Sequence, residues 1–590
     1  MQSFWRSTRL MGLLTFLCSS PSFCQSTWIE VQSPHFRVLT DSNAKSGRAV
    51  ANEFEQIRHV MAVRFQDPEI NSAVPMTIIA ARNSDTVRDL MPRAWKDTGG
   101  TFAGMLMAGW ERQTAMVRLN AFENHARGPV YFEYTGSVLT SKFHWLPSWL
   151  YRGLCEYFSF TEFDSQRIAV GGPSPDWIAY LRTRRLLPIS QMMDDSKSFQ
   201  NSDDQMIWMG ESWAAVHYMV SGEGMGNGAK LADFIHKVAT GTPQLEAFRA
   251  VFGDIALFDR GLQNYVELKT FYYQPMPLDA AIAPDGFAIR TLSPEEADYE
   301  IGAFQVQVGE RKAGREHLEH ALMLGDSLAA AHEELGFADF LDGKDDDAAK
   351  EWHKALELDP SRYRSLFALT MQASPLASQS YQQLAETRMA LQKVIDLAPK
   401  YAAAYADLGL VDGRLGSLQR AYDDVHKAET LAPWRAGYHI LAGYLLFRAN
   451  QPEKAAGFAR TIAAEWKGVD HDEAVDLWQS IPAEMRGAGD SLTLQLPKGS
   501  TLTRGQLTDE ACPADGAGDV TLTVIPDGEG AKPVVLRSKG PRLRVGYSDT
   551  FWWGEDHYTL CHHLTGHRVL AAVKDGVVVE LEVRDDFPWH

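Results

Sequence analysis

Apolar positions alternate with polar ones at the start of the chain, just after residue 27. The apolar set recurs at the two-residue period of a half-buried strand and comprises Ile29, Val31, Phe36 and Val38. Residues 43–65 change to a spacing of three or four, which predicts a helix. The runs at 75–81 and 104–120 predict a buried strand and then a hairpin with its turn near Gly109. This order predicts an α/β domain.

Two further helical patterns lie on either side of a turn at Leu146-Pro147. The first contains Phe132-Glu133-Tyr134-Thr135-Gly136, and the second runs from Trp149 to Phe158. Helical spacing then resumes over 212–219, 230–239, 245–252 and 255–271. We therefore expect the first domain to cover residues 27–274. The stretch 275–292 is rich in proline and alanine and is predicted to be a linker.

Residues 293–470 carry a repeat pattern. Pro360 and Pro433 each close a unit of about 34 residues, in which glycine and alanine recur at the same offsets. Small residues let paired helices cross closely, and proline ends the second helix. The pattern is typical of tetratricopeptide repeats (TPRs), with about four or five units. Such arrays commonly hold an extended peptide or a partner's helix in a groove.

Glycine, proline and alternating β-type residues dominate the segment 486–590. Residues 519–525 and 532–538 flank Pro526-Asp527-Gly528-Glu529-Gly530, and a second tight turn is expected at Asp575-Gly576. These signals predict a small all-β domain, either a sandwich or a barrel. The fold class is therefore multidomain α+β: an α/β domain, a helical solenoid and a β domain.

The first 24 residues have the pattern of a secretory signal peptide. Arg6 and Arg9 precede an apolar run from Leu10 to Cys18, which is too short to span a bilayer. A lipid anchor through Cys18 or Cys24 is less favoured because a large residue precedes each cysteine. We expect a periplasmic or secreted protein with no membrane span.

Composition narrows the class of partner. The chain has 590 residues, a length that favours several domains, and a net charge of −19. No basic block compensates that charge, which argues against a nucleic-acid partner.

Three cysteines remain beyond the leader. Cys155 lies within a helix and is expected to be a buried free thiol, whereas Cys512 and Cys561 share the last domain, where export permits a disulfide between them.

The stretch from Tyr131 to Phe160 resembles the two-helix core of the gluzincin metallopeptidases, in the peptidase-like domains that precede helical repeats in secreted bacterial proteins. In that family the helices read roughly H-E-Y-T-H and W-L-N-E-G-L-A-E-Y-F, whereas this chain reads F-E-Y-T-G and W-L-Y-R-G-L-C-E-Y-F. The resemblance implies a gluzincin-like fold over about 28–274, in which the last strand lies along the substrate cleft.

The resemblance also places the metal ligands at Phe132, Gly136 and Arg152. A catalytic zinc needs three protein ligands and an open position for water. Phenylalanine and glycine offer no ligand atom, and arginine adds a positive charge where the cation would sit. The general-base position, Glu133, and an acidic supporting position, Glu156, remain. We expect a degenerate site with no metal and no cofactor, in which the Arg152 guanidinium replaces the cation and pairs with one or both carboxylates.

Three other features have alternative interpretations. His125 or His144 could supply displaced zinc ligands, which keeps a non-standard zinc metallopeptidase as the rival function. The cluster from Trp552 to His563 is interpreted as a packed loop in preference to a metal site or a partner- or glycan-binding loop. The glycine-rich run 222–228 follows a helix rather than a strand, which predicts a turn and not a nucleotide-binding loop.

The sequence therefore predicts an exported, non-catalytic scaffold. Its TPR groove would bind a protein or peptide, and the inactivated cleft would retain an edge strand able to pair with a peptide backbone.

Overall fold

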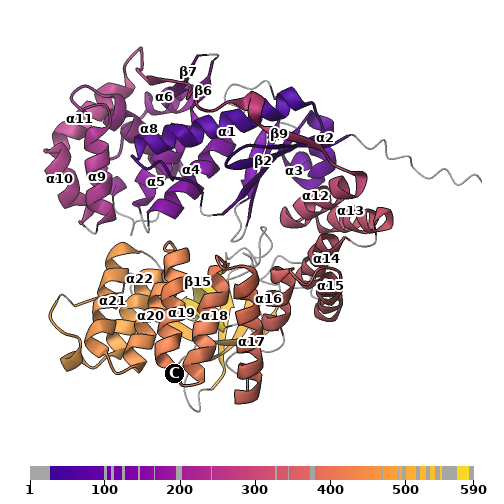
Figure 1. Ribbon diagram of the computed structural model, residues 1–590. Coiled ribbons are helices and arrows are strands. Elements are labelled where there is room, and N and C mark those ends of the chain that lie inside the picture. The colour runs from indigo at the N-terminus through magenta and orange to yellow at the C-terminus, as the bar shows by residue number, and fades with distance from the viewer. Residues whose placement is uncertain are drawn as a thin grey trace, which may run out of the picture.

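The computed structural model describes residues 27–583 apart from 73, 99–101, 108–111, 122–126, 144–145, 165, 194–201, 241, 326–327, 343, 373–378, 467–468, 490, 495–499, 513–518, 527–531, 539–544 and 548–567. The predicted leader, 1–24, lies outside these residues. The chain forms an N-terminal α/β part, a helical array and a small β-barrel (Figure 1). No helix in the described ranges is both long and apolar enough to cross a bilayer.

A six-stranded mixed sheet organises the N-terminal part. Its order is β4-β5-β3-β2-β1-β9, with β2, β3 and β5 parallel and the remaining neighbours antiparallel. The strands are β1 (Ile29–Gln32), β2 (Phe36–Thr40), β3 (Met76–Ala81), β4 (Gly104–Met107), β5 (Gln113–Arg118) and β9 (Ala288–Thr291). The hairpin predicted over 104–120 is thus formed by β4 and β5, and Gly109 lies outside the described residues.

Different helices pack against the two faces of this sheet. Val38 and Ile78 face α1 (Ala44–Arg64) and the helices that follow the sheet. Leu39 and Ile79, which point the opposite way because strand side chains alternate, pack against α2 (Ser84–Leu90), α3 (Pro92–Asp97) and α12 (Pro294–Gln307). The first helix of the array is therefore also a layer of the N-terminal domain.

The segment predicted to be a linker, 275–292, contains two strands. β8 (Gln274–Pro277) pairs with β7 (Arg167–Val170), which also pairs with β6 (Glu162–Phe163), and β9 pairs with β1. Pro275 and Pro277 are tolerated because β8 is an edge strand, where a missing N–H breaks no interior ladder. The segment thus belongs to the N-terminal domain, although its proline content is typical of a linker.

Eight helices between β5 and β8 complete the N-terminal domain in the described ranges. They are α4 (Gly128–Lys142), α5 (Ser148–Ser159), α6 (Pro175–Leu181), α7 (Ile189–Met192), α8 (Ser202–Ser221), α9 (Ala229–Ala239), α10 (Gln244–Phe252) and α11 (Ile255–Val266). Helix α5 packs against both α4 and α8. A Cβ at Gly153 would collide with the Ser212 carbonyl, so glycine permits the close α5–α8 contact.

The repeat region consists of stacked helix pairs. Gly302, Gly336 and Gly409 each lie in the first helix of a pair, and a Cβ at these positions would collide with Leu318, Trp352 and Val425, respectively, in the second. The pairs are α12 with α13 (Arg311–Leu324), α14 (Ala329–Leu341) with α15 (Asp345–Leu358), α16 (Tyr363–Gln372) with α17 (Tyr381–Leu397), α18 (Ala402–Arg414) with α19 (Leu418–Leu431), and α20 (Ala436–Arg448) with α21 (Pro452–Glu465). The predicted TPR architecture is confirmed. It continues through α22 (Val469–Ser480), beyond the predicted end at 470.

The C-terminal domain is a small barrel. Its strands follow the order β12-β11-β10-β14-β15, and a parallel contact between β12 and β15 at Arg537 and Val577 closes the circuit. β13 adds to β15. The strands are β10 (Ser500–Ala511), β11 (Val520–Pro526), β12 (Val534–Ser538), β13 (Val545–Tyr547), β14 (Arg568–Lys574) and β15 (Val577–Val583).

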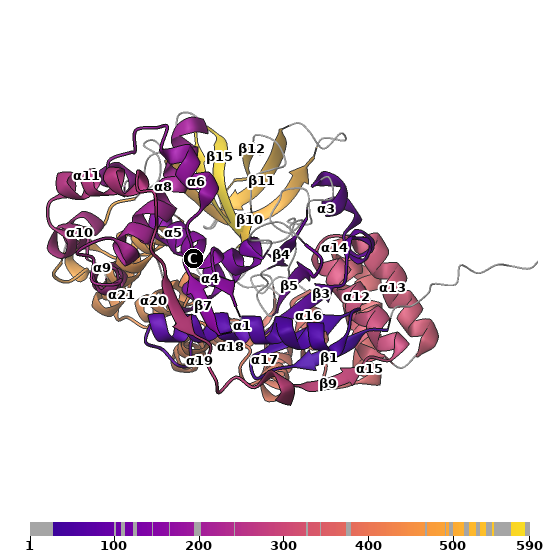
Figure 2. The same cartoon turned by 90° about the horizontal axis from the view of Figure 1, so that it is seen from above.

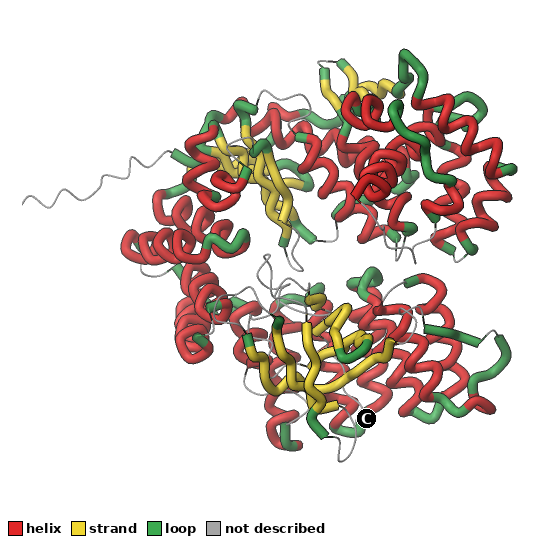
Figure 3. Tube along the Cα trace, turned by 180° about the vertical axis from the view of Figure 1, so that it is seen from behind, coloured by secondary structure: helices red, strands yellow, loops and turns green. Residues whose placement is uncertain are grey.

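The barrel lies against the later repeats (Figure 3). Arg504 on β10 pairs with Asp476 on α22 at 2.7 Å, and its guanidinium lies 5.7 Å from the centre of the Tyr444 ring on α20. Cys512, one residue after β10, is disulfide-bonded. Its predicted partner, Cys561, lies outside the described residues, so the pairing stays a prediction.

Candidate functional site

Helices α4 and α5 carry all five positions that the sequence singles out. The large apolar side chains that fix the two helices are buried: Tyr134, Trp149 and Leu150 have no exposed surface. Pro147 precedes α5 in extended conformation and ends the connection from α4. The structure therefore brings Phe132, Glu133 and Gly136 to one helix, and Arg152 and Glu156 to the helix packed beside it.

The Arg152 side chain lies between an aromatic ring and a carboxylate. Its guanidinium carbon is 5.5 Å from the centre of the Phe132 ring, and its Nη2 is 3.9 Å from the Glu156 Oε2. Glu156 also accepts a 2.6 Å hydrogen bond from Trp177 Nε1 on α6. A cation over an aromatic face is favourable in a partly desolvated setting. The positive charge of this site is thus supplied by the protein and held by Phe132 and Glu156.

Glu133 does not take part in that arrangement. It lies on the exposed side of α4 and forms no ion pair with Arg152, so of these two carboxylates Arg152 pairs with Glu156 alone. The neighbouring protein removes part of its hydration and raises the pKa of Glu133, since desolvation disfavours the charged form. Compared with a free glutamate, this carboxyl group therefore favours its neutral form.

The space beside Gly136 is filled by Tyr151. A Cβ at residue 136 would collide with the Tyr151 hydroxyl and would lie 3.6 Å from the Cys155 Sγ. Burial raises the pKa of both Tyr151 and Cys155, which keeps the phenol and the thiol neutral. Cys155 is a buried free thiol, as predicted. A histidine at position 136 would therefore meet a packed side chain where a metal would have to approach.

These residues do not fit a zinc site. The Phe132 ring and Gly136 have no ligand atom, and Arg152 is a permanent cation. Across the described ranges, no group of three or more His, Cys, Asp or Glu side chains is arranged to hold one metal ion. His125 and His144, the candidates for displaced ligands, lie outside those ranges, as does the cluster from Trp552 to His563.

The glycine-rich run after α8 is a turn, as predicted. Gly224, Gly226, Asn227 and Gly228 all have positive φ, the left-handed conformation that favours glycine and, among other residues, asparagine. It leads into α9 and does not follow a strand.

Sequence reasoning missed the contacts that tie this domain to the repeats. Arg112, just before β5, pairs with Glu334 on α14 at 3.1 Å. Thr114 on β5 donates a 2.6 Å hydrogen bond to Gln307 at the end of α12. No local sequence pattern predicts contacts between residues more than 190 positions apart. An acidic pair in the middle of a repeat helix, Glu333-Glu334, is a sequence signal that indicates charged partners for that helix. Seen from above, α12 to α15 lie beside the sheet domain (Figure 2).

The solved structures that resemble this chain include several TPR proteins, each of which matches about a third of it. No family model and no curated protein matches the chain. Similar solved structures include PilF of Pseudomonas aeruginosa, with 20% identity over 32% of this chain and 84% of that one at a TM-score of 0.27. The TPR protein YrrB is 19% identical over 31% of this chain and 85% of that one, with a TM-score of 0.24. TTC0263, a TPR protein of Thermus thermophilus, is 17% identical over 32% of this chain and 98% of that one, with a TM-score of 0.25. The TPR assignment rests on the helix pairs and small-residue positions of the chain itself.

Proposed function

We propose that this protein is an exported, non-catalytic scaffold that binds other proteins or peptides. In this proposal the N-terminal domain is a gluzincin-like pseudopeptidase, and TPR-like repeats provide the main partner surface. The observation that carries the proposal is the Phe132–Arg152–Glu156 arrangement, in which a fixed cation occupies the ligand face of a peptidase-like helix pair. Chemistry that needs a bound metal cannot proceed at these residues, whereas binding can.

The edge of the N-terminal sheet supports peptide binding. β4 is the last strand in the sheet order, and no described strand pairs with its outer side. Arg118 N donates to the Ala103 carbonyl at 2.9 Å, and antiparallel ladders alternate, so the amides of Gly104 and Leu106 face outward. A free edge offers main-chain donors and acceptors to an extended peptide without any metal.

The repeats support a scaffold role through their construction. Stacked helix pairs expose an extended surface whose shape depends on contacts between neighbours. Here the first two pairs are bonded to the sheet domain and the last helices contact the barrel, so the array connects the two other domains. The bonded state of Cys512 supports an oxidising location such as the periplasm or the exterior.

Residue-resolved hydrogen exchange tests the edge-strand part of the proposal. Peptides would be selected from a random display library on the full chain, and exchange would be compared with and without a selected peptide. We expect the outward amides of Gly104 and Leu106 to slow on binding, with the peptide recovered intact. The Met105 amide, already within the ladder, and the opposite sheet edge at β9 serve as internal controls. Peptide binding without slower exchange at β4, or chelator-sensitive cleavage of the peptide, would contradict the proposal.

A further inference from the structure

A second site lies on the opposite face of α5. Helical geometry places Arg152 and Glu156 on one side of α5 and Leu154, Tyr157 and Phe158 on the other. The latter three residues line a pocket of about 750 Å³ between the ends of α1 and α4 and the helix α9. This volume falls within the range of about 300–1,000 Å³ typical of small-molecule sites. The pocket is therefore separate from the former metal positions.

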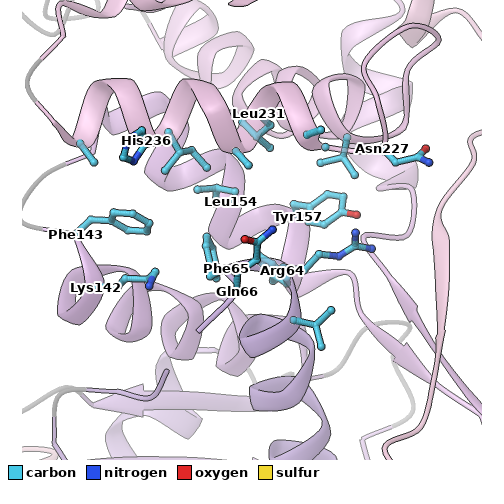
Figure 4. A pocket seen from close by; sticks show the side chains of 18 residues that line it. Arg64, Phe65, Gln66, Lys142, Phe143, Leu154, Tyr157, Asn227, Leu231 and His236 are labelled. Atoms are coloured by element: carbon cyan, nitrogen blue, oxygen red, sulfur yellow. The ribbon is translucent and has the colours of Figure 1, made fainter. Parts of the chain in front are cut away.

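The pocket has an apolar body and a polar end. Its apolar lining includes Phe65, Phe143, Leu154, Phe158, Leu231 and Ile235. Figure 4 shows Arg64, Tyr157 and Asn227 gathered at one end, and Phe143 with Lys142 and His236 at the other. A ligand that matches this lining carries an apolar chain and one polar head.

Two donors at the polar end have no partner within the described residues. The Arg64 Nε and the Tyr157 hydroxyl are both buried and form no hydrogen bond. Burial raises the pKa of Tyr157 to about 12 despite the nearby Arg64 charge, so the phenol keeps its proton and can donate. Buried polar groups without partners are costly, and a ligand acceptor placed between these two would satisfy both.

The charge of the lining selects an anion. No aspartate or glutamate is among the lining residues, although the chain as a whole has a net charge of −19. Lys142 also lines the pocket, but Asp67 already pairs with it at 2.7 Å. The Arg64 guanidinium has no carboxylate partner in the described ranges. A carboxylate would supply the acceptor atoms and the charge that this end lacks.

We propose that this pocket binds a single-chain aliphatic carboxylate, with the carboxylate at Arg64 and Tyr157 and the chain along the apolar body. All the lining residues come from helices and their turns, so no strand edge is available to pair with a peptide backbone. A flexible hydrocarbon chain needs no such partner. The proposal is independent of the scaffold function.

Isothermal titration calorimetry of the full chain tests the site. Sodium decanoate is the probe, below its micelle-forming concentration, with decan-1-ol and decyltrimethylammonium as matched ligands of different charge. We expect one saturable decanoate site, binding of the alcohol weaker by about tenfold or more, and no binding of the cation, because hydrogen bonds to a charged group carry the difference.

Variants locate the site. Arg64→Met keeps the apolar stem and should weaken decanoate binding by about tenfold or more, with little change for decan-1-ol. Tyr157→Phe should act in the same direction, and Leu231→Trp, which fills the apolar body, should weaken both ligands. Arg260→Met alters an exposed arginine on α11 and should leave binding unchanged. The absence of saturable decanoate binding, equal affinity for acid and alcohol, or undiminished binding to a folded Arg64→Met protein overturns the proposal.

Discussion

Replacing Glu334 by alanine is expected to lower the free energy of unfolding of the repeat array by about 3 kcal/mol, because it removes a buried carboxylate from the two arginines that it pairs with. Glu334 is fully buried on α14. Its Oε1 is 2.8 Å from Arg364 Nη1 on α16, and its Oε2 is 3.1 Å from Arg112 Nη2 beside β5. One carboxylate thus joins two successive repeats to the N-terminal sheet.

The electrostatics of Glu334 explain the expected size of the effect. Burial raises the pKa of Glu334, but the charges of Arg112 and Arg364 together outweigh that and hold the pKa below its usual value. Arg364 also lies 4.5 Å from the centre of the Phe337 ring. Removing the carboxylate would leave Arg364 paired with Glu333, which lies 3.3 Å from its Nη1, and would break the bond of Arg112 across the domain boundary.

Urea unfolding followed by far-ultraviolet circular dichroism measures this change, since the repeats contribute much of the helix. Glu357→Ala is the matched control, because it removes an exposed ion pair with Lys354 in the same repeat and should change little. If Glu334→Ala unfolds at the same urea concentration as the Glu357→Ala protein, the buried ion pair does not hold the array to the sheet.

The N-terminal domain is expected to lose about 3 kcal/mol of stability between neutral pH and pH 4 through one residue, His217. This histidine is fully buried on α8, and its Nδ1 lies 2.7 Å from the Tyr265 hydroxyl. Burial lowers the pKa of His217 to about 4 from 6.5. Because the folded pKa is below the unfolded one, the unfolded chain binds the proton first. The contribution is complete above pH 6.5 and is lost as the pH falls toward 4.

Urea unfolding followed by tryptophan fluorescence at pH 7 and pH 5 measures this loss. His217→Gln keeps a partner for Tyr265 but does not titrate, so the stability difference between the two pH values should shrink by about 2 kcal/mol relative to the unaltered protein. His236→Gln, an exposed change on α9, should keep the original difference. An unchanged difference in the His217→Gln protein would show that His217 is not kept neutral by the fold.

The repeats were predictable because their packing depends on local residue size. Gly336 and Trp352 lie sixteen positions apart in one unit, and the crossing of α14 and α15 requires a side chain as small as glycine opposite that indole. The all-β character of the C-terminal domain was predictable from its turns and alternation. The choice between a sandwich and a barrel was not, because the single parallel contact of β12 with β15 leaves no periodic signal.

The remaining features depend on contacts distant in sequence. Residues 288–291 were interpreted as a linker, but β9 completes the sheet by pairing with β1, about 260 residues earlier. At the candidate site, residue type alone indicates that Phe132 and Gly136 offer no ligand atom, whereas the assignment of Phe132, Gly136 and Arg152 as former ligand positions stays a prediction from the resemblance. Two contacts could not be predicted, because they depend on side-chain direction and on a third helix. Tyr151 fills the space beside Gly136, and Trp177 donates a hydrogen bond to Glu156.

The central claim is that the helix pair α4–α5 keeps a peptidase-like framework without a metal. Its most direct test is metal analysis of the purified protein by inductively coupled plasma mass spectrometry, after dialysis against zinc and then against metal-free buffer. We predict far less than one zinc per chain, with the same residual amount in Glu133→Gln and Arg152→Ala proteins. One tightly held zinc per chain, together with chelator-sensitive peptide cleavage that Glu133→Gln abolishes, would contradict the account.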